Sequence, residues 1–177
     1  MSSAVIYTDL DGTLLDHHTY AFYEALETIK GLKDRGIPII PCTSKTRAET
    51  LSLMQAVGID GPMIIENGAA IWVPQDWGLE RPEGSESGAD AWCHSFGPSR
   101  GMIRRQLAIL SIEWGNRYQS LCDLSDKQVA AVTGLDLDGA ARAKQREHCE
   151  TLIWLGTPAD RKTFAEQVET LDMRCLQ

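Results

Sequence analysis

The sequence lacks the features that mark membrane proteins, secreted proteins and zinc modules. It has no apolar run long enough to cross a bilayer, and its start, MSSAVIYTDLDG, has no basic segment followed by an apolar one. Its five cysteines are odd in number and show neither a CxxC pair nor a spacing typical of metal ligands. We therefore expect reduced thiols, no signal peptide and a cytoplasmic location.

Positive charge is also scarce. The chain has 17 Lys and Arg against 25 Asp and Glu, which gives a net charge of −8. This balance disfavours nucleic acid and anionic membranes as partners, because both bind through basic surfaces. With 177 residues, 43% of them hydrophobic, the chain is long and apolar enough for a sizeable core. The sequence gives no indication of oligomeric state.

The first third of the chain predicts an α/β fold. Short apolar runs typical of buried strands lie at residues 4–8, 37–41 and 62–66, with helical patterns between them. Strands that alternate with helices over short connections favour a parallel sheet, and ligands bind at the carboxyl ends of its strands. Asp9, Thr43 and Asn67 each follow directly on one of these strands, so they are candidate site residues.

The second half predicts a separate α+β domain. We expect an α/β core at residues 1–78, a linker rich in Gly, Ser, Pro and acidic residues at 79–100, and the second domain at 101–177. Within that domain the patterns predict helices at 103–114, 125–134, 139–148 and 158–171, and strands at 118–122, 151–155 and 173–176.

The motif YTDLDGTLLD is the most informative segment. It places Asp9 and Asp11 two residues apart where a strand gives way to a loop, and Gly12 permits a tight turn there. This arrangement suits a nucleophilic carboxylate with a partner that exchanges protons with the leaving group. The same oxygens suit a hard cation such as Mg²⁺. The alternative is a strand followed by an ordinary Asx turn.

This motif resembles DxDGT, the first motif of the haloacid dehalogenase (HAD) superfamily of phosphotransferases. The resemblance implies a Rossmann-like parallel-sheet core and a reaction in which Asp9 attacks phosphorus to form an aspartyl-phosphate. It implies that Asp11 protonates the leaving oxygen and then activates water. It also implies that Asp9 and the main-chain carbonyl of Asp11 ligate Mg²⁺.

Further candidates surround these two aspartates. The superfamily's second motif is a Thr or Ser after the next strand, where PCTSKTRAE supplies Thr43 with Ser44 and Lys45 at a helix start. Free N–H groups and a lysine at a helix N-terminus favour binding of a phosphate. Asn67 is a further candidate for phosphate binding, although Asn-Gly also predicts a turn between two strands, and both can hold.

TSKTRAE together with ENGA resembles the family of mannosyl-3-phosphoglycerate phosphatases. VTGLDLDGAARAKQREHCETLIW is similar to the segment of their C2-type cap domain. The family implies hydrolysis of the phosphate from a mannosyl or glucosyl 3-phosphoglycerate, a small phosphorylated sugar. Other Cof-type sugar phosphatases and phosphomannomutases are the alternative, and these usually lack TSKTRAE.

The cap segment supplies a candidate carboxylate clamp. On the predicted helix 139–148, Arg142 and Arg146 are four residues apart and would share a face, with Gln145 beside them. The alternative is a solvated basic face. Two other patterns have structural readings: Arg100, Arg104 and Arg105 indicate a solvated helix start, and the DxDG letters at 136–139 indicate a helix cap.

Two motifs that the superfamily resemblance implies do not follow the cap. These are a Lys that holds the phosphoryl charge and a GDxxND-like acidic pair that completes the Mg²⁺ site; the acidic residues after Trp154 have no such context. We therefore expect an incomplete core and a truncated phosphatase. The alternative is a non-catalytic protein that binds a sugar phosphate or a partner chain.

Overall fold

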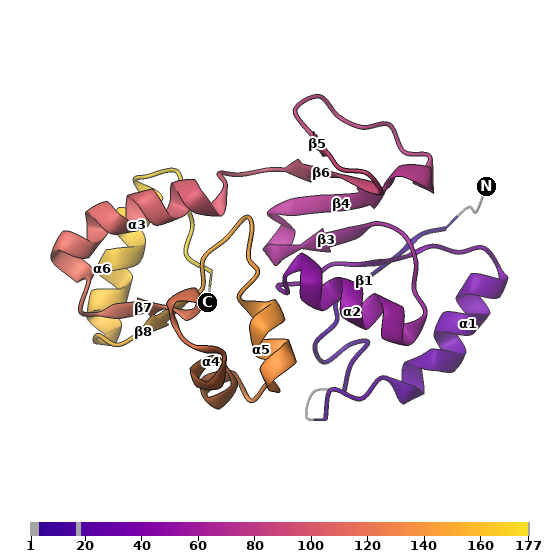
Figure 1. Cartoon of the computed structure of the whole chain (residues 1–177), viewed down its shortest axis with the longest axis horizontal. Coiled ribbons are helices and arrows are strands. Elements are labelled where there is room, and N and C mark those ends of the chain that lie inside the picture. The colour runs from indigo at the N-terminus through magenta and orange to yellow at the C-terminus, as the bar shows by residue number, and fades with distance from the viewer. Residues whose placement is uncertain (1–3, 17–18, 177) are drawn as a thin grey trace. The chain divides into compact units, whose positions relative to one another are not determined.

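The computed structural model describes residues 4–16 and 19–176, in two units that divide between Gly97 and Pro98 (Figure 1). The first unit contains, in chain order, β1 (Ile6–Thr8), α1 (Leu26–Asp34), β2 (Ile39–Pro41), α2 (Arg47–Val57), β3 (Met63–Ile65), β4 (Ala70–Pro74), β5 (Glu86–Ser87) and β6 (Ala91–Ser95). The second contains α3 (Arg100–Trp114), β7 (Tyr118–Ser120), α4 (Asp126–Thr133), α5 (Leu137–Ala143), β8 (Leu152–Trp154) and α6 (Pro158–Glu169).

The first three strands run parallel, as the sequence predicts. β1 pairs with β2 in the register Ile6 to Ile39, and a parallel bridge between Cys42 and Ile64 joins the end of β2 to β3. The predicted capping box is present at the start of α2: Thr46 accepts from the Glu49 N–H, and the Glu49 carboxylate accepts from the Thr46 N–H. The α/β fold class is thus confirmed, with the carboxyl ends of β1, β2 and β3 at one edge.

The first unit also contains antiparallel strands that the composition concealed. β3, β4, β6 and β5 form a sheet in that order, so two strands lie within the predicted linker 79–100. Trp92 of β6 faces Val73 of β4 in register, and both side chains are buried. Gly, Ser and Pro are concentrated before β6, whereas residues 91–95 have the side chains of an ordinary strand. Composition averaged over the whole stretch therefore masked a five-residue strand.

The second unit is an α+β arrangement. β7 and β8 pair antiparallel, and α3 and α6 lie side by side beside them (Figure 1). Its main core is built from Leu107, Trp114, Phe164 and Val168. A second capping box, Ser125 with Gln128, begins α4 as the sequence predicts. Asp136 accepts from the Gly139 N–H and caps α5, which confirms the reading of the second DxDG as a helix cap.

Two predicted elements of this unit are wrong. α5 ends at Ala143, so the predicted basic helix 139–148 stops about a turn after it begins. Beyond it, the Lys144 carbonyl accepts from the Cys122 thiol and the Glu147 carbonyl from the Arg100 N–H, in place of amides one helical turn ahead. The predicted strand 173–176 is irregular, and Asp172 before it has a left-handed φ of 56°.

None of the helices described is long and apolar enough to cross a membrane.

Candidate active site

The two aspartates of the first motif lie on the loop that follows β1. Leu10 between them is only 1% exposed and anchors this loop in the core. The Leu10 N–H donates to Asp9 Oδ1 at 2.7 Å, and Gly12 turns the chain with a φ of 72°. Asp9 is exposed and Asp11 half-buried. Burial of the leucine therefore sets both carboxylates on the outer side of the loop.

The segment after β2 is fixed by main-chain hydrogen bonds to both neighbouring strands. The Cys42 N–H donates to the Thr8 carbonyl at 2.8 Å, and the Thr43 N–H donates to the Ile64 carbonyl at 3.0 Å. Thr43 is 4% exposed, and its hydroxyl oxygen accepts from the Lys45 N–H at 3.2 Å. The Thr43 side chain is therefore held at the strand edge by its surroundings.

The turn after β3 completes this edge. The Asn67 N–H donates to the Thr43 carbonyl at 2.9 Å, and the Glu66 N–H donates to the Lys45 carbonyl at 3.0 Å. Glu66 and Asn67 have left-handed φ values of 50° and 61°, a conformation that non-glycine residues rarely adopt. Hydrogen bonds to the neighbouring loop hold this backbone in place. The predicted turn is confirmed at Asn67, between β3 and β4.

These three segments surround one pocket of about 480 Å³. It is lined by Asp9, Asp11, Cys42, Thr43, Ser44, Ile64, Asn67 and Gly68. Five of these are residues that the sequence predicts for the site: the structure brings Asp9, Asp11, Thr43, Ser44 and Asn67 together. Sequence reasoning missed Cys42, Ile64 and Gly68, although each adjoins a predicted residue in the chain or the sheet.

Charge in the pocket is mostly negative. Burial, together with the neighbouring charge of Asp9, raises the pKa of the Cys42 thiol, so this residue stays uncharged at neutral pH. A cation comes from Lys45, whose ammonium lies 2.9 Å from Asp11 Oδ1. The same ammonium lies 5.7 Å from the centre of the Tyr20 ring, a cation–π distance.

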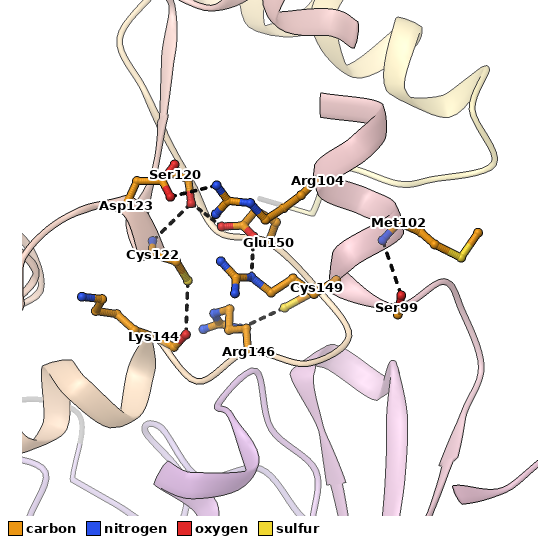
Figure 2. Close-up of polar contacts among 11 residues, drawn as sticks. Ser99, Met102, Arg104, Ser120, Cys122, Asp123, Lys144, Arg146, Cys149 and Glu150 are labelled. Carbon is orange, nitrogen blue, oxygen red and sulfur yellow. Dashed lines mark hydrogen bonds and ion pairs between the residues drawn. The ribbon is translucent and has the colours of Figure 1, made fainter. Parts of the chain in front are cut away.

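The remaining predicted residues lie in the second unit. Arg142 occupies the last turn of α5, and Gln145 and Arg146 follow in the irregular segment. The expectation that Arg142 and Arg146 share a helical face is therefore wrong, because the helix ends between them. Gln145 Nε2 donates to the Ala141 carbonyl at 3.4 Å. Arg146 Nη1 donates to Cys149 Sγ at 3.0 Å (Figure 2).

A buried ion pair stabilises this region, and sequence reasoning missed it. Arg100 Nε lies 2.6 Å from Glu150 Oε2, and the Glu150 side chain is 1% exposed. The Ser120 hydroxyl donates to the other oxygen of Glu150 (Figure 2). The prediction of a solvated basic helix start is therefore wrong for Arg100, while Arg104 makes a more exposed pair with Asp123 at 2.9 Å. Partners 50 residues apart leave no signal in sequence periodicity.

Comparison with known proteins gives a relative that covers most of the chain. A glucosyl-3-phosphoglycerate/mannosyl-3-phosphoglycerate phosphatase from Methanococcoides burtonii is 40% identical over 147 residues, which are 82% of this chain and 54% of that protein. The chain thus spans about half the length of the curated relative it matches.

Solved structures show the same fold at low identity. A protein from Geobacillus kaustophilus superimposes with a TM-score of 0.61 at 15% identity, covering 95% of this chain and 63% of that one. A HAD-superfamily phosphatase from Bacteroides thetaiotaomicron gives a TM-score of 0.57 at 19% identity, covering 93% and 60%.

A family model also matches this chain. Residues 6–81, which contain all three pocket segments, match the haloacid dehalogenase-like hydrolases. Together with the DxDGT motif and the parallel sheet, this match identifies residues 6–81 as a haloacid dehalogenase-like hydrolase segment, in a chain that resembles the mannosyl-3-phosphoglycerate phosphatases.

Proposed function

We propose that this chain is the nucleophile-bearing part of a phosphomonoester hydrolase that acts on mannosyl- or glucosyl-3-phosphoglycerate. The observation that carries the proposal is the meeting of Asp9, Asp11, Thr43 and Asn67 around one pocket at the carboxyl ends of three parallel strands. That edge is where ligands bind in open α/β sheets. The name of the relative from Methanococcoides burtonii supports the choice of substrate.

The proposed reaction has two displacements. In the first, an oxygen of Asp9 bonds to phosphorus as the bond from phosphorus to the substrate oxygen breaks, and Asp11 gives that oxygen a proton. In the second, Asp11 takes a proton from water as the water oxygen bonds to phosphorus and the Asp9–phosphorus bond breaks. Phosphate leaves, and both aspartates return to their starting state.

Neutral donors suit the phosphoryl oxygens, and one cation lies beside Asp11. The Thr43 hydroxyl, the Ser44 segment and the Asn67 amide line the pocket, so we assign them to binding of the transferring group. Lys45 adds positive charge beside Asp11. In the second unit, we assign Arg142, Gln145 and Arg146 to the glyceryl carboxylate, without a shared helix face.

The donor set fits Mg²⁺. Asp9 presents an exposed carboxylate to the pocket, and Mg²⁺ binds through one or two carboxylates while keeping water and phosphate ligands. Asp9 and the Asp11 carbonyl would hold the ion, which would screen the carboxylates from the phosphate dianion. Within residues 4–16 and 19–176, no cluster of three or more His, Cys, Asp or Glu is placed to hold a metal ion.

The proposal includes a cytoplasmic location. All five cysteines are free in the structure, which suits a reducing compartment.

Phosphate release from the two 3-phosphoglycerate glycosides tests the proposal. We expect release in the presence of Mg²⁺, loss of at least about 10³-fold in Asp9→Asn because the nucleophile is removed, and unchanged rates in Asp60→Asn. Asp60 is a suitable control because its carboxylate is 84% exposed and pairs with Lys33. Undiminished release by Asp9→Asn would contradict the mechanism.

Two further outcomes separate the alternatives. Faster release from hexose phosphates than from the glycosides would favour a broader Cof-type phosphatase or a phosphomannomutase-like enzyme. Tight binding of a glycoside without release would favour a non-catalytic sugar-phosphate-binding protein.

A further inference from the structure

The two oxygens of the Asp11 carboxylate have different surroundings. Oδ1 is shielded from solvent and lies 2.9 Å from the ammonium of Lys45, an ion pair without hydrogen-bond geometry. The Asp11 side chain as a whole nevertheless remains 37% exposed. Because Oδ1 contributes almost nothing to this exposure, Oδ2 is the oxygen that solvent and ligands can reach.

Contacts on several sides hold the Lys45 ammonium beside Oδ1 of Asp11. Its side chain is 18% exposed, although lysine is a long and usually solvated residue. Its N–H donates to the Thr43 hydroxyl and its carbonyl accepts from the Glu66 N–H, so both neighbouring pocket segments fix its backbone. The Tyr20 ring lies against the ammonium at 5.7 Å. The ammonium is therefore held between Tyr20 and Asp11.

We propose that Lys45 is a positioning residue that holds Asp11 Oδ1, so that Oδ2 carries the proton to the leaving group and takes it from water. This inference rests on the proposed function and deepens it. An ammonium beside Oδ1 pairs with the ionised carboxylate, and it can still lie against Oδ1 when Oδ2 carries the proton. The orientation of Asp11 then survives both displacements.

This role predicts which substrates depend on Lys45. When the bond from phosphorus to an alcohol oxygen breaks, the leaving alkoxide is strongly basic and needs the proton from Oδ2 at that moment. A nitrophenolate leaving group is stable without it. Lys45 therefore matters most for phosphate esters of alcohols, the class to which phosphoglycerate glycosides belong.

Kinetics with two leaving groups test the proposal. In Lys45→Met we expect kcat/KM, which reports the first displacement alone, to fall about 10²-fold for a 3-phosphoglycerate glycoside, the lower end of a general-acid contribution, with less than about tenfold loss for p-nitrophenyl phosphate. Lys45→Arg should recover most of kcat/KM because it restores the charge. Equal losses of kcat/KM for both esters would show that Lys45 binds phosphate directly and would overturn the proposal.

A second measurement does not depend on turnover. Acetylation of Lys45 by acetic anhydride, followed by mass spectrometry, should be up to about fivefold faster in Asp11→Asn, the factor expected when a partly exposed ion pair is lost. Lys33 is the internal control, because its partner is Asp60 and its labelling should not change. Unchanged Lys45 labelling would overturn the pairing even if phosphate is released. Faster labelling in a chain that releases no phosphate would instead count against the proposed function alone.

Discussion

The segment after β2 and the segment after α5 both supply predicted anion-binding residues, and they are stabilised in opposite ways. Residues 42–46 are fixed by main-chain hydrogen bonds to Thr8, Ile64 and Asn67. Residues 144–150 are fixed largely through side chains, with Cys122 on the Lys144 carbonyl and Arg100 and Ser120 on Glu150. We therefore expect the first segment to keep its fold when a functional side chain is changed, whereas in the second the side chains are themselves the support.

The largest expected effect is on the buried ion pair of the second unit. Glu150→Ala leaves Arg100 without its carboxylate in a mostly buried position, so we expect a loss of about 3–5 kcal/mol in the free energy of unfolding of this unit. Hydrogen exchange at the β8 amides measures it. Asp123→Asn is the matched control: its pair with Arg104 is about half exposed, and we expect less than about 1 kcal/mol. Equal losses of unfolding free energy in the two variants would contradict the support of residues 144–150 by the buried pair.

At the β3 turn, two substitutions separate backbone from side chain. Asn67→Gly keeps the left-handed φ of 61° without strain, so we expect unchanged stability together with weaker phosphate binding. Asn67→Ala should cost about 1–2 kcal/mol in addition, because alanine disfavours this conformation. Urea unfolding gives the stabilities, and inorganic phosphate serves as the binding probe. A loss of stability in the glycine variant as large as that in the alanine variant would show that the amide supports the fold.

The capping boxes of α2 and α4 should behave alike, although the helices belong to different units. Thr46→Ala and Ser125→Ala each remove the side chain that accepts from the third residue of its helix, and each should cost about 1 kcal/mol. Hydrogen exchange in α2 and α4 provides the measurement, because each helix reports on its own unit. A loss of stability in only one of the two helices would indicate that contacts around the other helix replace its cap.

The smallest effect concerns pH. Burial, reinforced by the charge of Glu150, raises the pKa of the Cys122 thiol above its ordinary value. The folded chain then binds this proton more tightly than the unfolded one, so the free energy of unfolding should fall as the pH rises through the ordinary thiol range. The urea midpoint between pH 8 and pH 10 measures this fall, and Cys122→Ala should reduce it. A midpoint that rises with pH would contradict the sign.

The sequence predicted the candidate site better than the cap segment, for a local reason. Asp9, Thr43 and Asn67 each stand one or two residues beyond an apolar strand, and parallel pairing alone brings strand ends together. The predicted clamp at Arg142 and Arg146 required a helix that continues past Ala143, and the spacing of the two residues favours one. In the structure, however, the carbonyls of Lys144 and Glu147 accept hydrogen bonds from Cys122 and Arg100, and the helix does not continue.

The sequence by itself determined the α/β order of the first strands, the aspartate pair at the first strand end, and the helix caps, because each depends on residues within a few positions of one another. Only the tertiary structure decided that β5 and β6 extend a sheet, that α5 ends early, that Arg100 finds Glu150, and that Lys45 reaches Asp11. These features join residues far apart in the chain. Their energies come from burial and charge pairing, which take effect when the distant segments pack together.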